Sequence, residues 1–239
     1  MSPSELRLSF GNVAETYHRV RPPYSQELLD RAQKALELDA SARVLDLAAG
    51  TGRLTQELRR RFAEVVAVEP DERMRAVHGE ALEGSAEAIP LDDTAVDAVF
   101  VGEAFHWFDP VAAIPELVRV LRPRGGLAIM SNHWWETEPP LPDEALEALR
   151  EPYDRSRLQR RPPWDDAFAE SPFEPLRYER AENTITVEPD ELLTLYSTTS
   201  SLAALPPGDR EALLARARPL LTGAYRLPIK HELVWTRRK

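Results

Sequence analysis

The chain has 239 residues, 43% of them hydrophobic, which is enough for one large α/β domain with an appended cap. It has no cysteine, so disulfides, thiolate zinc ligands and thiol nucleophiles are excluded. The formal net charge of -10 argues against a nucleic-acid partner, because neutralising phosphates needs clustered Lys and Arg. No signal-peptide pattern and no run of ~18 apolar residues is present, so we expect a soluble cytoplasmic protein with no membrane partner.

Four regions are expected along the chain. Residues 1–40 form an N-terminal arm and helix, and they contain the pattern Phe-x3-Ala-x2-Tyr-x3-Arg-Pro-x-Tyr from Phe10 to Tyr24. Residues 41–132 alternate strands and helices, which predicts a parallel, doubly wound α/β sheet. Residues 133–175 are rich in Trp, Pro and charge and are expected to form a cap, with a helix from Asp143 to about Tyr153. Residues 176–239 are expected to supply further helices and the closing strands.

The most informative stretch is residues 44–55, where an apolar strand runs into an acid, a small-residue turn and a helix. The turn from Ala48 to Gly52 has small or missing side chains, which let a ligand approach the backbone closely. Thr55 stands where a dinucleotide site would have its third glycine, which weakens a pyrophosphate interpretation. A cofactor of another kind is therefore favoured.

Four further segments follow in order. Glu64–Glu69 is a strand that ends in an acid 17 residues beyond Gly52, near the spacing at which a carboxylate meets ribose hydroxyls. A short third strand at 81–85 leads to the Ala86-Glu87 loop, and Val96–Gly102 is the fourth strand. Asp109 and Pro110 are an N-cap and a first helical residue, and this helix ends in a Pro-Gly turn before the fifth strand.

These five motifs, in this order, resemble the class I S-adenosylmethionine (SAM) dependent methyltransferases. The resemblance implies a seven-stranded, mostly parallel Rossmann-like sheet with an antiparallel last strand, SAM as cofactor and S-adenosylhomocysteine as product. Ala48 replaces the family's first glycine, which the turn tolerates unless that residue needs a positive φ. The implied cofactor contacts are Asp46, Ala48, Gly50, Thr51, Gly52, Glu69, Pro70, Met74, Ala86, Glu87, Glu103 and Ala104.

The N-terminal pattern and the sequence His106-Trp-Phe-Asp109 resemble one subgroup, the methyltransferase type 11 proteins related to trans-aconitate methyltransferases. In that subgroup the arm folds over the cofactor. The resemblance implies that Tyr17 lies against the sulfonium as a catalytic residue and that Arg21 pairs with a cofactor or substrate carboxylate. The alternative is that Tyr17 and Arg21 only dock the arm onto the domain.

Residues after the fourth strand and in the cap are candidates for catalysis and acceptor binding. His106 is either a general base or acceptor-orienting group, or it hydrogen-bonds a backbone carbonyl and braces its loop. Trp107 packs the pocket or the sheet, and His133, Trp134 and Trp135 are candidate acceptor contacts. The alternative for the tryptophan pair is a place in the core under the cap.

The C-terminal region is expected to contain a strand at 176–180 and helices near 190–205 and 208–221. In the last segment Leu227, Ile229, Leu233 and Trp235 alternate with polar residues, which predicts a half-buried edge strand. The five histidines show no H-E-x-x-H spacing, so no metal site is expected.

The sequence thus predicts a SAM-dependent methyltransferase that acts on a small-molecule acceptor, at oxygen, nitrogen or a carboxylate, by in-line displacement. Two alternatives stay open. One is a non-catalytic SAM-binding sensor or assembly protein. The other, which only the fold class suggests, is an NAD(P)-dependent oxidoreductase.

Overall fold

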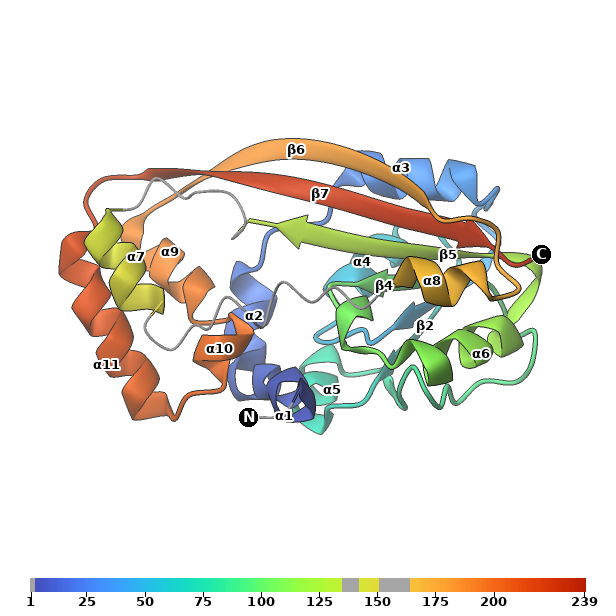
Figure 1. Ribbon diagram of the computed structural model, residues 1–239, viewed down its shortest axis with the longest axis horizontal. Coiled ribbons are helices and arrows are strands. Elements are labelled where there is room, and N and C mark those ends of the chain that lie inside the picture. The colour runs from blue at the N-terminus through green and yellow to red at the C-terminus, as the bar shows by residue number, and fades with distance from the viewer. Residues whose placement is uncertain (1–2, 135–141, 151–163) are drawn as a thin grey trace. The chain divides into compact units, whose positions relative to one another are not determined.

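The computed structural model describes residues 3–134, 142–150 and 164–239, and its chain divides into two compact units (Figure 1). Unit 1 comprises residues 1–22, 133–160 and 182–230. Unit 2 comprises residues 23–132, 161–181 and 231–239. The first helix after the arm therefore belongs to unit 2, and the segment 133–175 is shared between the units. No helix in the described ranges is both long and apolar enough to cross a membrane.

Seven strands form one sheet in the order β3-β2-β1-β4-β5-β7-β6. They are β1 (Arg43–Leu47), β2 (Glu64–Glu69), β3 (Leu82–Glu83), β4 (Val96–Gly102), β5 (Leu121–His133), β6 (Arg177–Val187) and β7 (Tyr225–Arg237). The pairs from β3 to β5 are all parallel, with Val44 of β1 between Val65 and Ala98 of its neighbours. The arrow of β7 points opposite to that of β5 (Figure 1). The predicted doubly wound sheet with an antiparallel last strand is confirmed.

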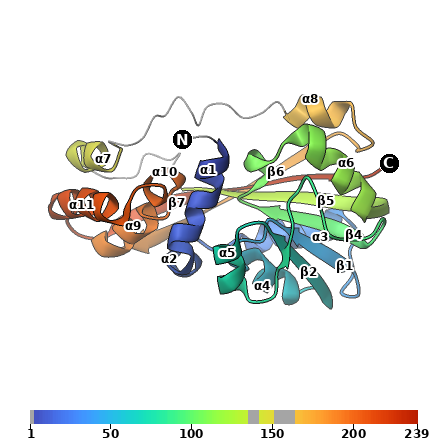
Figure 2. The same ribbon diagram turned by 90° about the horizontal axis from the view of Figure 1, so that it is seen from below.

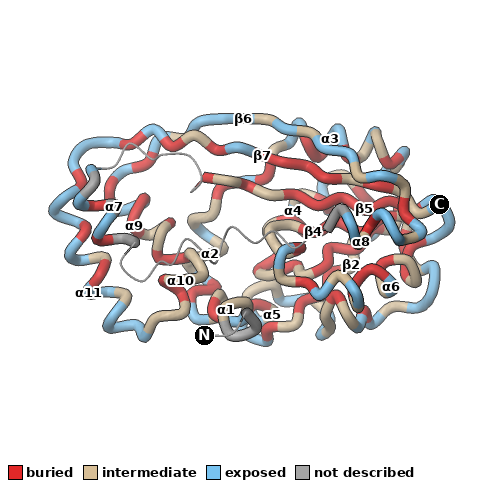
Figure 3. The backbone as a smooth tube through the Cα atoms, in the orientation of Figure 1, coloured by how far each residue is buried: buried red, intermediate tan, exposed pale blue. Residues whose placement is uncertain are grey.

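The last strand is not an edge strand, and that part of the prediction is wrong. β7 lies between β5 and β6, so β6 forms the edge. Long stretches of β7 are buried, whereas β6 is exposed or half-buried over most of its length (Figure 3). Alternation along a strand reports burial of one face, but the hydrogen-bonding neighbours lie in the plane of the sheet. β6 also extends well beyond the predicted 176–180. The prediction was too short because most of the strand's residues are polar, and a search for apolar runs does not detect such an edge strand.

Helices cover both faces of the sheet in unit 2. Leu45 and Leu47 of β1 pack in one buried cluster with residues of α6 and α8, whereas Val44 packs in another with residues of α3 and α4. Figure 2 shows α6 and α8 on one side of the strands and α4 on the other. The helices of unit 2 are α3 (Gln26–Ala35), α4 (Arg53–Arg59), α5 (Glu72–His78), η2 (Phe105–Trp107), α6 (Pro110–Val120) and α8 (Trp164–Ala169).

The start of α6 follows the prediction. The Asp109 side chain accepts a hydrogen bond from the Val111 N–H at 3.0 Å, and Pro110 is the first helical residue. Pro115 lies inside the helix without ending it. The Asp109 cap thus fixes the start of α6 directly after the short segment 103–108 that follows β4.

Unit 1 is a helical layer with its own core. Its helices are α1 (Pro3–Leu8), η1 (Ser9–Val13), α2 (Ala14–Val20), α7 (Asp143–Arg150), α9 (Pro189–Tyr196), α10 (Ser200–Ala203), α11 (Pro207–Ala217) and η4 (Arg218–Leu220). Leu192, Leu202 and Leu227 are fully buried there. The helix predicted over 190–205 is two helices, because the hydroxyls of Ser197 and Thr199 donate to carbonyls of the preceding turn.

Candidate functional site

The turn between β1 and α4 is left-handed at three residues. Ala48, Gly50 and Gly52 have φ of 57°, 57° and 84°. A Cβ on Gly52 would lie 2.8 Å from Cδ2 of His78, so a side chain there would have to displace the His78 ring as well as adopt a positive φ. Ala48 is not a glycine, so its positive φ costs about 1–2 kcal/mol. From the sequence, alanine is expected to be tolerated here unless the residue needs a positive φ. Ala48 does have a positive φ, so the turn is strained.

Asp46, the last acid before this turn, is fully buried. Its Oδ2 accepts a hydrogen bond from the Thr55 hydroxyl at 2.6 Å, whereas its Oδ1 has no partner among the described residues. Burial is the main cause that raises the pKa of Asp46 to about 7; the Thr55 hydrogen bond lowers it and the Glu69 charge raises it further. The Thr55 hydroxyl also lies 3.0 Å from Nε2 of His78, which can donate to it. Next to the strained turn there is thus a buried acid, one oxygen of which is unpaired as far as the structure describes the chain.

Glu69, at the end of β2, ties this turn to the neighbouring strand. Its Oε2 accepts from the Gly50 N–H at 2.9 Å, and its Oε1 accepts from the Asp71 N–H at 2.8 Å. Burial is the largest cause that raises the pKa of Glu69, and these two hydrogen bonds oppose it. Pro70 follows in a half-buried position, and Met74 in α5 is buried. The carboxylate is fixed by backbone donors while part of its acceptor capacity stays unused.

The loop after β3 is held against α6. Ala86 is buried, and Glu87 accepts a hydrogen bond at Oε1 from the Asp109 N–H at 3.1 Å. Glu116 of α6 accepts from the Ile89 N–H at 2.8 Å. The loop and the start of α6 therefore form one hydrogen-bonded assembly.

The segment after β4 contains a further non-glycine residue with left-handed backbone, Glu103, with φ of 59°. Its N–H donates to the Met130 carbonyl at 2.9 Å, and its side chain accepts from the Asn132 N–H. Ala104 is half-buried. Strained residues of this kind persist only where the surrounding structure holds them, and they cluster at functional sites.

His106 and the aromatic residues after it have different environments. His106 is exposed, and its ring lies 4.8 Å from that of the half-buried Trp107. Phe105 and Phe108 are buried and pack together at 5.1 Å between ring centroids. Phe108 therefore packs in the core, whereas the neighbouring His106 is accessible from solvent.

Three of the predicted residues of unit 1, namely Tyr17, Arg21 and Trp134, lie together. The Arg21 guanidinium lies 4.7 Å from the Tyr17 ring centroid and 5.6 Å from that of Trp134. It also donates to the hydroxyl and carbonyl oxygens of Thr198, at 3.0 and 2.5 Å. Trp134 is fully buried, His133 is half-buried at the end of β5, and Trp135 lies outside the described residues.

Sequence reasoning missed several polar residues of unit 2. Thr55 and His78 support Asp46 and Gly52, as described above. Asn132 and His231 are both buried, and Nδ1 of His231 lies 2.6 Å from Oδ1 of Asn132. His231 falls on the apolar face of the β7 alternation, and a lone polar residue on that face is the signal that could have found it. Within the described ranges no three His, Cys, Asp or Glu side chains gather to hold a metal ion.

The family profile described as "Methyltransferase domain" matches residues 45–129. The methyltransferase Rv3342 of Mycobacterium tuberculosis is 40% identical over 223 residues, which cover 91% of this chain and 87% of the relative. The YcgJ protein of Bacillus subtilis has the same fold, with a TM-score of 0.57 at 20% identity, covering 90% of this chain and 99% of YcgJ.

A solved complex of geranyl diphosphate C-methyltransferase from Streptomyces coelicolor A3(2) with S-adenosylhomocysteine aligns with a TM-score of 0.50 at 14% identity. It covers 89% of this chain and 76% of that enzyme. At this identity the likeness shows the fold alone. Because the mycobacterial relative matches nearly the whole length of both chains, this chain belongs to the family of SAM-dependent methyltransferases.

Proposed function

We propose that this enzyme transfers the methyl group of SAM to a small-molecule acceptor, at oxygen, nitrogen or a carboxylate, and that the β1–α4 turn holds the methionyl end of the cofactor. The observation that carries the proposal is the buried Oδ1 of Asp46, which has no partner among the described residues. An unsatisfied buried carboxylate oxygen is costly, so a ligand that supplies a cationic donor is favoured there. The ammonium group of SAM is such a donor.

The β1–α4 turn and Glu69 also offer room and acceptors for the rest of the methionyl group and for the ribose. Apart from its two chain neighbours, no atom of the described residues lies within 4 Å of the position that a Cβ on Gly50 would occupy, so a ligand can approach its backbone. Thr51 is buried beside it. Glu69 uses two of its roughly four acceptor sites for backbone N–H groups, which leaves capacity for the two ribose hydroxyls.

The adenine end is assigned to the loop after β3. We propose that the Ala86 backbone and the Glu87 carboxylate contact adenine, with Pro70, Met74 and Ala104 as packing groups and Glu103 near the reacting end. The hydrogen bond from the Asp109 N–H fixes the Glu87 side chain and leaves its second oxygen for a ligand donor. The support for this assignment is the burial of Ala86 and Met74 beside these held carboxylates.

When bound, SAM supplies an electrophilic methyl group, which passes in line to the acceptor while the C–S electron pair stays on sulfur. The protein's part is to hold the acceptor in line and keep water out. His106 is proposed to take the proton released by a hydroxyl or amine acceptor, since its side chain is exposed after β4, where ligands of open α/β sheets bind. A carboxylate acceptor releases no proton and needs no base.

The candidate contacts in unit 1 already interact with other residues of that unit. Tyr17 is proposed to lie against the sulfonium and Arg21 to pair with a carboxylate of the cofactor or acceptor. The hydrogen bonds from Arg21 to Thr198 support the docking role that the sequence left open. Trp107, His133, Trp134 and Trp135 are kept as proposed acceptor contacts, although the full burial of Trp134 favours its core alternative.

The test combines a binding measurement with a transfer assay. S-adenosylhomocysteine at 100-fold excess over its Kd should stabilise the protein by about 2.7 kcal/mol, or several degrees of Tm. The protein is then incubated with methyl-labelled SAM and a metabolite extract of its source. Label in a new small molecule identifies the acceptor. Binding without transfer to any fraction favours the sensor alternative, and absence of binding overturns the cofactor assignment.

A further inference from the structure

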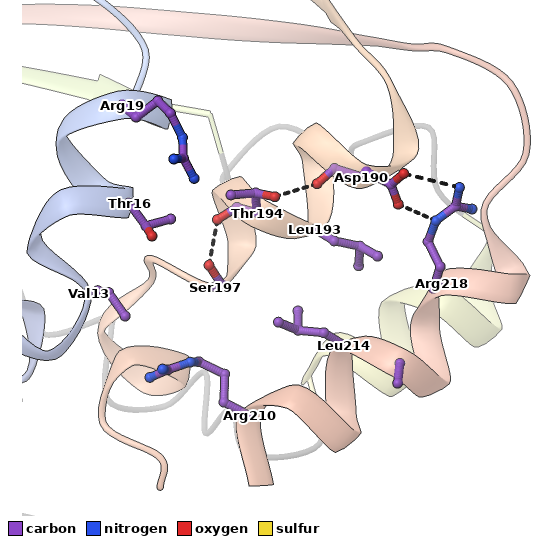
Figure 4. Close-up of a pocket in the computed structure, with 11 residues that line it drawn as sticks. Val13, Thr16, Arg19, Asp190, Leu193, Thr194, Ser197, Arg210, Leu214 and Arg218 are labelled. Carbon is purple, nitrogen blue, oxygen red and sulfur yellow. Dashed lines mark hydrogen bonds and ion pairs between the residues drawn. The ribbon is translucent and has the colours of Figure 1, made fainter. Parts of the chain in front are cut away.

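Unit 1 has a pocket of about 430 Å³ between α2, α9 and α11 (Figure 4). All the residues that line it belong to unit 1. Its volume lies within the range of about 300–1,000 Å³ that small-molecule sites occupy. None of its lining residues takes part in the SAM site proposed above.

The pocket has a positive charge in an acidic protein. Three arginines, Arg19, Arg210 and Arg218, line it with one acid, Asp190, which gives a net charge of +2 against -10 for the whole chain. Arg218 forms an ion pair with Asp190 (Figure 4). Across the described ranges neither Arg19 nor Arg210 has a carboxylate partner, so these two guanidinium groups carry the uncompensated charge.

Arg210 is half-buried, whereas Arg19 and Arg218 are exposed, so it is the least solvated of the three arginines. Its Nη1 is buried and has no hydrogen-bond partner in the part of the chain that the structure describes. The side chain extends from α11 toward the α2 side of the pocket, and Arg19 reaches from α2 toward α9 (Figure 4). Since Nη1 has almost no accessible surface, a ligand in the pocket would meet the other guanidinium nitrogens of Arg210, which carry the same delocalised charge. A guanidinium group matches the oxygens of a carboxylate or phosphate.

The remaining walls are apolar or already bonded. Leu193 and Leu214 point into the pocket from α9 and α11, and Val13 adds a buried apolar side chain (Figure 4). The hydroxyl protons of Thr194 and Ser197 go to main-chain carbonyls at 2.6 Å. Charged recognition therefore falls to the arginines, the Thr16 hydroxyl on α2 is a further polar group, and the leucines suit an aliphatic chain.

We propose that this pocket binds a small organic anion, with its carboxylate or phosphate on Arg210 and Arg19 and its short apolar body against Leu193 and Leu214. The site is independent of the methyl-transfer proposal, because binding there needs neither cofactor nor turnover.

The test is isothermal titration of the intact protein with three probes at low salt: octanoate, its neutral analogue octanamide, and inorganic phosphate. We expect octanoate to bind at least tenfold more tightly than octanamide. Arg210→Gln and Arg19→Gln should each weaken octanoate binding at least tenfold. Arg226→Gln, which removes an exposed arginine of unit 1 outside the pocket, should change it less than twofold.

The outcomes separate the headgroups and the folding effects. Phosphate binding that Arg210→Gln abolishes would support the site with phosphate as the headgroup. Arg210→Lys keeps the charge without the fork and should give an intermediate loss, which protects the test if the glutamine variant fails to fold. Equal binding of octanoate and octanamide, no effect of the arginine variants, or no binding of any probe would overturn the proposal. S-adenosylhomocysteine should stabilise the arginine variants as much as the wild type. Failure of S-adenosylhomocysteine to bind the wild type would count against the SAM site only and not against this pocket.

Discussion

Replacing Asp46 by Asn tests whether the buried carboxylate controls both stability and cofactor binding. Burial raises the pKa of Asp46 from 3.8 to about 7 in the folded protein. The folded state then holds this proton more tightly than the unfolded chain does. Stability therefore falls as pH rises from about 4 to about 7, and the full cost is present above pH 7.

The size of the effect follows from the two pKa values. Between pH 5 and pH 8 linkage gives a loss of about 2.5 kcal/mol for the wild type from this one group, an order-of-magnitude figure. In a protein of this length that corresponds to roughly 5–10 °C of Tm. Asp46→Asn keeps an acceptor for the Thr55 hydroxyl and removes the titration. It also places an amide where Oδ1 has no partner within the described part of the chain, which shifts stability by a constant amount at every pH.

The assay is thermal unfolding of wild type, Asp46→Asn and the exposed control Asp209→Asn at pH 5, 6, 7 and 8 without ligand. The Tm of Asp46→Asn minus that of wild type should increase from pH 5 to pH 8, and that of Asp209→Asn should stay flat. A difference for Asp46→Asn that does not change with pH would refute the argument. In the wild type the affinity for S-adenosylhomocysteine should also fall about tenfold per pH unit below 7, because the ligand ammonium needs the ionised carboxylate.

Three further variants test the turn and the chemistry. Glu69→Ala removes the acceptor of the Gly50 and Asp71 N–H groups and should abolish tight binding of S-adenosylhomocysteine in titration; retained affinity would contradict the ribose assignment. Ala48→Gly removes the cost of the positive φ and should raise the free energy of unfolding by about 0.5–1 kcal/mol, measured in urea melts. A decrease would contradict the inference that Ala48 is strained. His106→Ala should lower kcat at least tenfold with unchanged Kd for S-adenosylhomocysteine, whereas an equal loss of both would mark the residue as structural.

The strands of the sheet were readable because parallel strands covered by helices are continuous apolar runs. β2 and β4 begin and end where the sequence predicts, and β1 begins one residue earlier. β6 was not readable over its full length, because an edge strand with polar side chains has no such run. The N-cap of α6 was also predictable, since an Asp-Pro pair acts through the backbone of its own helix.

Within the candidate site, the positions of the two acids were predictable from the sequence, but their hydrogen bonds and raised pKa values were not. Asp46 and Glu69 stand at strand ends where the motif puts them. Two further features depend on how distant segments pack: one Asp46 oxygen has no partner among the described residues, and the Gly50 N–H donates to Glu69. Thr55 was noted only as the residue that replaces a glycine, and its hydrogen bond to Asp46 needs α4 to pack against β1. Burial, the main cause of the raised pKa values, is a property of the packed core.

By itself the sequence determined the fold class, the family and the position of the small-residue turn, because these follow from local periodicity and from glycines that few residues can replace. Only the tertiary structure decided that β7 lies inside the sheet and that Ala48 is held at positive φ. It also decided that Arg210 faces a pocket without a partner among the described residues. The physical reason is that strand order, backbone strain and unpaired buried groups arise from contacts between segments far apart in the chain, which no local pattern encodes.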